Sequence, residues 1–262
     1  MKLNLQILVL VLGFSGILKA QGSKQLSDSL IHAEWVDFER DNGSVLKAFV
    51  VYPESRAATK AVIVIHENLG LNEWIMTFSE KVAGQGFLVI SPDLISNRVE
   101  GIEKTTDFEN NDKVRDAIYA LDQEHVTKDL NLVYNYVEND PAVNGKISVV
   151  GFGWGGSQSF SYAAQNPNLE NVMVYYGAAP QDLTILKFIK SPVYGFYGAA
   201  DNKVNMTIPD TEKTMKDYGN LYTFDIYEDA GHAFMSRGAQ EAYGPNNMAY
   251  EKSWKKLISL LK

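Results

Sequence analysis

The sequence predicts an α/β domain built on a mostly parallel, doubly wound sheet, with helices on both faces and an N-terminal hairpin. Short, mostly apolar runs recur along the chain, as is typical of strands that are buried on both faces. Between these runs, apolar residues repeat with helical spacing. Because parallel strands need crossover connections, this alternation favours a sheet that helices cover on both sides.

Residues 1–20 have the pattern of a secretory signal peptide. Lys2 precedes an apolar run from Leu5 to Leu18, and Ala20 offers a small residue for cleavage. A membrane anchor is the alternative, but this run has about 14 residues, whereas a membrane span needs about 20. We therefore expect an exported protein, periplasmic or secreted, with no membrane association after cleavage and a single domain over residues 21–262.

A hairpin is expected to open the domain. Residues 32–39 and 45–52 flank Asp41-Asn42-Gly43, a sequence that favours positive φ and hence a turn. Five apolar runs then provide the expected strands of the sheet, at 61–65, 87–90, 147–150, 172–176 and 193–197.

Three helices are indicated by apolar residues that recur on one face. Asn72 can cap the first of them, and Gly84 and Gly86 would end it. The apolar residues of the three helices are Ile75, Phe78 and Val82; Val126, Leu130, Val133 and Val137; and Trp254, Leu257, Ile258 and Leu261. The long irregular stretch 92–107 is either a functional loop at the end of a strand or a solvated connection.

Composition excludes several classes of partner and cofactor. Lys and Arg number 24 against 32 Asp and Glu, and cleavage would make the chain two charges more negative, so nucleic acid and anionic membranes are unfavourable partners. The chain has no cysteine and hence neither disulfide nor thiolate. No metal-ligand spacing is evident. Gly151, Gly153 and Gly156 spell G-x-G-x-x-G, but the acidic partner of a dinucleotide site is not evident, so we expect no cofactor.

Side chains that could take part in catalysis follow the predicted strands, where ligands bind in an open α/β sheet. His66-Glu67-Asn68 follow the first buried strand, and the sequence from Gly151 to Gly156 has the form of a nucleophile elbow. Asp201 and then His232 come later in the chain. The order of elbow, acid and histidine is that of the α/β-hydrolase triad, in which the acid orients the histidine and the histidine activates the nucleophile.

In these segments the chain resembles the dienelactone hydrolases, or carboxymethylenebutenolidase-like proteins, and especially their exported members. The resemblance covers nearly all of residues 21–262, and the matching segments are 62–72, 91–94, 144–146, 155–160, 194–198 and 230–234. It implies an α/β-hydrolase fold and an activity on small esters or lactones.

The resemblance also implies the roles of the site residues. The family's nucleophile is a cysteine at the apex of the elbow, where this chain has Gly153, so the position is vacant. His232 would be the base, Asp201 the residue that orients it, and Glu67 the acid that contacts the resting nucleophile.

Further roles follow from the same analogy. The backbone N–H groups of Asn68 and Trp154 would form the oxyanion hole, and backbone donors survive a change of side chain. Arg98 and Arg237 lie in predicted loops near the site and are candidates for holding a substrate carboxylate. The alternative for both arginines is an ordinary surface position.

Three interpretations of Gly153 stay open at the level of sequence. Glycine tolerates the strained backbone of an elbow, so a lineage that no longer needs the thiol can drift to it. Alternatively, a water activated by His232 or Glu67 replaces the thiol, or the recorded residue is an engineered or miscalled one. Ser157 and Ser159 fall in the helix after the elbow and are expected to bond within it or to pack under it rather than to replace the nucleophile.

The leading hypothesis is therefore a dienelactone-hydrolase-like hydrolase of small esters or lactones, weak or inactive because Gly153 lacks a nucleophile. The alternative is a non-catalytic protein of the same fold that binds a small ester, lactone, carboxylated or apolar ligand. A scaffold that serves only for interactions comes third. Vacating the nucleophile position of a triad usually leaves only about 10³ to 10⁴ over the uncatalysed rate.

Overall fold

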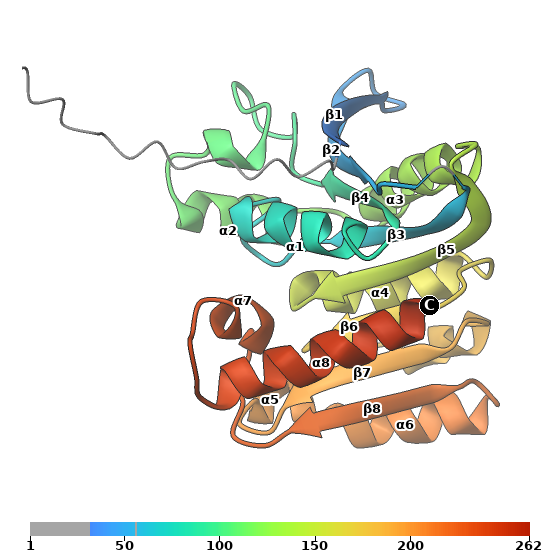
Figure 1. Cartoon of the computed structure of the whole chain (residues 1–262), viewed down its shortest axis with the longest axis vertical. Helices are drawn as coiled ribbons and strands as arrows, with labels where there is room; N and C mark the ends of the chain where they lie inside the picture. Colours follow the sequence, from blue (N-terminus) through green and yellow to red (C-terminus); the bar gives the residue numbers. More distant parts are fainter. Residues whose placement is uncertain (1–31, 56) are drawn as a thin grey trace, which may run out of the picture. The chain divides into compact units, whose positions relative to one another are not determined.

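A single eight-stranded sheet organises the computed structural model, which describes residues 32–55 and 57–262 (Figure 1). The expected signal peptide lies outside the described residues. The strands run in the order β1-β2-β4-β3-β5-β6-β7-β8. Their bounds are β1 His32–Glu39, β2 Val45–Tyr52, β3 Thr59–Ile65, β4 Leu88–Asp93, β5 Val143–Phe152, β6 Val172–Tyr175, β7 Val193–Gly198 and β8 Tyr222–Tyr227.

The expected hairpin and parallel sheet are confirmed. β1 pairs with β2 in antiparallel fashion across a turn in which Gly43 has a φ of +77°. β2 then pairs antiparallel with β4, and every pairing from β4 to β8 is parallel. The hairpin therefore extends one edge of a parallel sheet.

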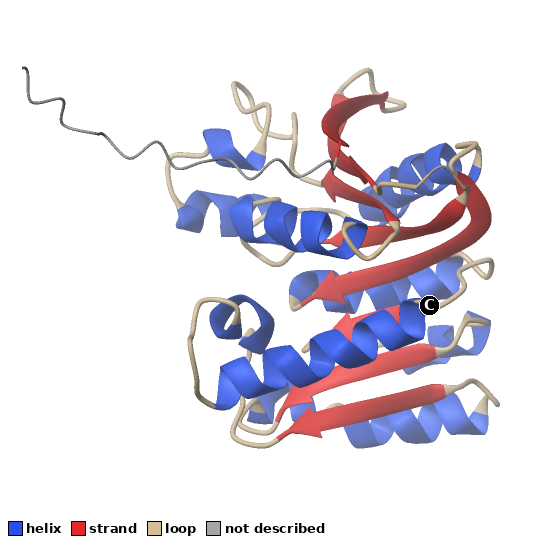
Figure 2. Ribbon diagram, viewed as in Figure 1, coloured by secondary structure: helices blue, strands red, loops and turns tan. Residues whose placement is uncertain are grey.

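Helices cover both faces of the sheet, as expected for a doubly wound fold (Figure 2). Their bounds are α1 Glu73–Ala83, α2 Asn111–Tyr119, α3 Gln123–Glu138, α4 Trp154–Gln165, α5 Asn202–Asn205, α6 Ile208–Asp217, α7 Phe234–Gly238 and α8 Pro245–Leu261. Residues of α1, α7 and α8 form one core with the sheet, and residues of α3, α4 and α6 form the other. On β3, Val62 and Val64 face the first core while Ala61, Ile63 and Ile65 face the second, so the strand is buried on both sides.

The three helices that apolar spacing indicates are present. The Asn72 side chain accepts a hydrogen bond from the Ile75 N–H and so caps α1. α3 ends at Glu138, just before Asp140-Pro141, and α8 carries the C-terminal apolar stripe. α2 and α6 have few apolar residues, so their periodicity was too weak to indicate them. None of the helices within residues 32–262 is long and apolar enough to cross a membrane.

The stretch 92–107 is an ordered loop. Strand β4 continues to Asp93, and a short 3₁₀ helix spans Thr105–Asp107. The buried Asp93 carboxylate accepts hydrogen bonds from the Thr105 N–H and hydroxyl, at 2.6 and 2.8 Å, which closes the loop on the strand. The end of the loop is therefore held to the strand, whereas residues 99–101 in its middle are exposed to solvent.

Parallel strands bring distant residues to one edge of the sheet. The carboxyl ends of β3, β5, β6, β7 and β8 lie at the same edge (Figure 1). The segments that follow them contain His66 to Asn68, Gly153, Tyr176, Asp201 and His232. Residues up to 166 positions apart are gathered there because each strand ends at the same level.

Candidate active site

The elbow is a sharp turn from β5 into α4. Gly153 caps the helix with φ +51° and ψ −112°, a conformation that L side chains rarely adopt. A Cβ on Gly155 would overlap the backbone carbonyl oxygens of Ile65 and His66, so only glycine lets the helix approach β3 this closely. A Cβ on Gly151 would overlap Gly155 as well. The glycine-rich sequence thus serves the packing of α4 against the sheet.

His232 and Asp201 are in direct contact. The Nδ1 atom of His232 lies 2.6 Å from Oδ2 of Asp201, and the other carboxylate oxygen accepts the Val204 N–H at the start of α5. The Asp201 side chain is 6% exposed, whereas the ring of His232 is 50% exposed. A buried carboxylate that caps α5 therefore fixes the rotation of the His232 imidazole, which remains open to solvent.

The free nitrogen of His232 faces the vacant apex. A Cβ atom placed on Gly153 would lie 3.6 Å from Nε2 of His232, which is ordinary van der Waals contact. The other close atoms belong to the ring of Tyr176, at 3.8 and 3.9 Å. The elbow thus has room for a side chain at position 153, and the Cβ atom of that side chain would already contact the imidazole.

Glu67 points inward, toward the same group. Its carboxylate is buried and accepts a hydrogen bond of 2.7 Å from the hydroxyl of Tyr176. Burial raises the pKa of the Glu67 carboxyl, and the Tyr176 hydrogen bond and the charge of His232 oppose that rise. Burial also raises the pKa of the Tyr176 hydroxyl well above its usual range, so this hydroxyl stays a donor.

Tyr176 is a site residue that the sequence did not single out, because its run of apolar residues marks it as the last residue of a strand. It instead follows β6 with a φ of +40°. Ala233, next to His232, also has positive φ, at +59°. Such conformations cost about 1–3 kcal/mol each and cluster at functional sites. The position just past a buried strand was the available signal.

The backbone N–H groups of Asn68 and Trp154, the expected oxyanion donors, form no hydrogen bond with the described part of the chain. Trp154 is the first residue of α4, where an N–H has no partner within the helix. Within residues 32–55 and 57–262, the backbone N–H of Asn68 donates to no protein acceptor. The Asn68 side chain is turned to the hydroxyl of Tyr119, with 3.0 Å between Nδ2 and Oη.

His66 lies beneath these donors and is fully buried. Its Nδ1 lies 2.8 Å from the Glu67 carbonyl oxygen, and its ring stacks on Trp154 with centroids 5.5 Å apart. Burial lowers the pKa of His66 to about 4.

The depressed pKa of His66 makes folding pH-dependent. A histidine whose folded pKa lies below its unfolded value stabilises the fold above the unfolded pKa, and this contribution is lost as pH falls toward the folded pKa. Between pH 7 and about 4, the pKa of about 4 implies a loss of about 3 kcal/mol. We expect His66→Asn to destabilise the protein more at pH 7 than at pH 4.5 in urea unfolding. An equal effect at both pH values would contradict a buried, neutral ring.

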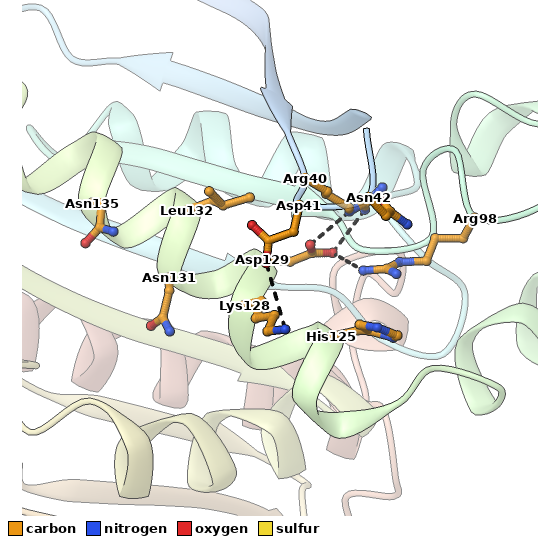
Figure 3. Close-up of a pocket in the computed structure, with 10 residues that line it drawn as sticks. All are labelled: Arg40, Asp41, Asn42, Arg98, His125, Lys128, Asp129, Asn131, Leu132 and Asn135. Carbon is orange, nitrogen blue, oxygen red and sulfur yellow. Dashed lines mark hydrogen bonds and ion pairs between the residues drawn. The ribbon is translucent and has the colours of Figure 1, made fainter. Parts of the chain in front are cut away.

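The two candidate arginines are placed differently. Arg237, on α7, is exposed and close enough to Glu67 to lower the pKa of that carboxyl. Arg98 does not join the group at the elbow. Its Nη2 lies 2.8 Å from Oδ2 of Asp129 (Figure 3), and its Nε donates to the Leu94 carbonyl. Its spacing from a strand end could not reveal this partner, which comes from α3.

Arg98 instead belongs to a buried ion cluster. Arg40 donates to both oxygens of Asp129, at 2.9 and 3.0 Å, and all three side chains are at most 15% exposed (Figure 3). The cluster borders a cavity of about 210 Å³ between the hairpin turn and α3, smaller than a typical ligand pocket. The ion cluster joins the hairpin, the loop after β4 and α3 through the side chains of Arg40, Arg98 and Asp129.

Removing the acid of this cluster should be costly, because it leaves Arg40 buried without its counter-charge. We expect Asp129→Ala to lower the free energy of unfolding by about 3–5 kcal/mol, measured in urea. Asp217→Ala is the matched control, since Asp217 pairs with Lys213 on the exposed face of α6 and should change nothing measurable. Equal effects of the two substitutions would contradict the role given to the cluster.

Ser157 and Ser159 are both held in structural hydrogen bonds. The Ser159 hydroxyl donates to the Gly155 carbonyl at 3.0 Å, and the Ser157 hydroxyl accepts the Ala178 N–H at 3.1 Å. Neither hydroxyl forms a hydrogen bond with His232, as a replacement nucleophile would.

The fold and the group around the elbow define an α/β-hydrolase. The sequence model of the dienelactone hydrolase family matches residues 46–262, and the chain belongs to this family. A Saccharolobus solfataricus protein assigned as a carboxymethylenebutenolidase is 30% identical over 258 residues, which cover 86% of this chain and 96% of the relative. An Escherichia coli K12 protein with the same assignment is 26% identical over 234 residues, covering 84% and 83%.

Solved structures share the fold. A crystal structure from Klebsiella pneumoniae, assigned as a dienelactone hydrolase, has a TM-score of 0.77 at 22% identity and covers 88% of this chain and 98% of that one. A dienelactone hydrolase-like promiscuous phosphotriesterase from metagenomic libraries has a TM-score of 0.74 at 20% identity, with 88% and 97% covered.

Proposed function

We propose that this chain is a weak hydrolase of small esters or lactones whose site lacks only the nucleophile. One observation carries the proposal: a side chain at Gly153 would start 3.6 Å from Nε2 of a histidine whose other nitrogen is bound to a buried aspartate. The ring of Tyr176 lies 3.8 Å from the same Cβ position, and its hydroxyl donates to Glu67. Membership of the dienelactone hydrolase family supports the substrate class.

The proposed reaction is a direct attack by water. A water in the space of the missing side chain gives its proton to Nε2 of His232 as it attacks the ester carbonyl carbon. The backbone N–H groups of Asn68 and Trp154 hold the resulting oxyanion, and Asp201 stabilises the imidazolium. The imidazolium then returns the proton to the leaving alkoxide as the C–O bond breaks. General base catalysis of this kind supplies about 10² to 10⁴ in rate, and Arg237 would hold a carboxylate on the substrate.

The test is an assay of aryl esters and lactones with the unaltered chain and with His232→Ala. We expect slow turnover, no acyl-enzyme burst, and a fall in rate of about 10²-fold or more in the variant, which keeps only what the oxyanion hole and binding supply. Turnover that is unchanged by His232→Ala would contradict the water mechanism. If the unaltered chain binds ester or carboxylate ligands without any turnover, the alternative of a non-catalytic binding protein is favoured, because the vacant apex is compatible with both.

A further inference from the structure

His66 contacts the two segments that carry the proposed oxyanion donors, at Glu67-Asn68 and at Trp154. Its Nδ1 lies 2.8 Å from the carbonyl oxygen of Glu67, and its ring stacks on the Trp154 side chain at 15° between the planes. The backbone N–H of Leu94 donates to Nε2 at 3.3 Å. Because the ring is fully buried and held at three places, its position and its rotation are both fixed.

The two hydrogen bonds assign the tautomer of the ring. A backbone N–H can only donate, so Nε2 must be unprotonated to accept from Leu94. A carbonyl can only accept, so Nδ1 carries the proton and donates it to Glu67. Both ring nitrogens are thereby engaged within the protein fold, and His66 acts as a constant donor rather than as a proton carrier.

The acceptor of this bond belongs to the peptide that carries an oxyanion donor. The carbonyl of Glu67 and the N–H of Asn68 are the two ends of one planar amide, and they point in opposite directions. Holding the carbonyl therefore also sets the direction of the N–H. A hydrogen bond accepted by the carbonyl further polarises the amide and strengthens its N–H as a donor.

We propose that His66 is a positioning residue of the oxyanion hole. It orients the Asn68 N–H through its bond to the Glu67 carbonyl, and it supports Trp154 through the stacked ring. The inference rests on the proposed function, since an oxyanion forms only if an acyl substrate is attacked at the apex. His66 itself does not touch the reacting atoms.

Three substitutions separate the contacts of His66. Asparagine places an amide N–H close to where Nδ1 lies and so keeps the donor to Glu67. Glutamine instead reaches the place of Nε2, and phenylalanine keeps the stacking alone. In the Gly153→Cys background we expect His66→Asn to retain kcat within about threefold, whereas His66→Gln and His66→Phe lower kcat by about 10- to 100-fold with KM nearly unchanged. Unfolding midpoints, measured in parallel, show whether each variant is folded at the assay temperature.

Two outcomes would overturn the inference. One is an equal loss of kcat in the Asn, Gln and Phe variants, and the other is a Phe variant with full kcat. A second measurement needs no activity: nitrogen-15 spectra of the unaltered chain should show His66 protonated at Nδ1 only, with no titration between pH 5 and 8. A ring protonated at Nε2, or one that titrates in this range, overturns the inference about His66 whether or not Gly153→Cys is active. A Gly153→Cys protein that hydrolyses nothing would instead refute the proposed function.

Discussion

Gly153→Cys is expected to raise kcat/KM for small aryl esters at least about 10³-fold above the unaltered chain. The elbow has room for the new side chain, because its Cβ meets only ordinary contacts with His232 and Tyr176. His232 would then take the thiol proton and generate the nucleophile. The measurement is a steady-state assay of the aryl ester and lactone panel with both proteins.

The gain in activity should come with a loss of stability. At a φ of +51° a Cβ is strained, and residues held in such regions cost about 1–3 kcal/mol. Gly153→Ala is the matched control, since it adds the same Cβ and the same strain without the sulfur. We expect both variants to unfold at lower urea concentrations than the unaltered chain and only the cysteine variant to gain activity. A comparable gain in the alanine variant would contradict a nucleophilic role for the apex.

His232→Gln in the Gly153→Cys background should lower kcat/KM by about 10³-fold or more, because the thiol loses its base. Asp201→Asn should also lower it strongly, since the amide can donate to Nδ1 and turn the imidazole to the wrong tautomer. Both are measured on the same aryl ester.

His125→Gln is the matched control for the loss of a histidine. His125 is exposed on α3 and lines the cavity beside Asp129 (Figure 3), and it forms no hydrogen bond with Glu67, Asp201 or His232. We expect kcat/KM to stay unchanged in that variant. An active His232→Gln protein would mean that the proximity of the imidazole to the apex has no part in the chemistry.

Much of the fold could be predicted because burial leaves a clear pattern. β3 and β6 are apolar on both faces and stand out as continuous apolar runs, whereas α3 buries a regular stripe with helical periodicity. The pairing order could not be obtained in this way. It places β4 between β2 and β3, and depends on which crossovers pack together over the whole sheet. Helices such as α2 lie mostly at the surface and bury few apolar residues, so the sequence gives no clear helical pattern for them.

The site could be predicted as far as strand ends define it. Glu67, Asp201 and His232 each follow a strand, and the sheet brings such positions together. Tyr176 escaped prediction because positive φ is not visible in a sequence. The partner of Arg98 escaped because Asp129 comes from a helix rather than a strand end. The contacts of His66 likewise depend on Leu94 and Trp154, which only the folded chain places around it.

The central claim is that a complete hydrolytic group surrounds an empty apex. Its most direct test uses the fact that the chain has no cysteine, so a cysteine introduced at residue 153 is its only thiol. Gly153→Cys is mixed with a β-lactone that forms a stable thioester, and intact mass and peptide mapping follow the rate of acylation. We predict one acyl group per chain, at residue 153, added far faster than to free cysteine and slowed to that reference rate by His232→Ala. Acylation at the rate of free cysteine, unchanged by His232→Ala, would contradict the claim.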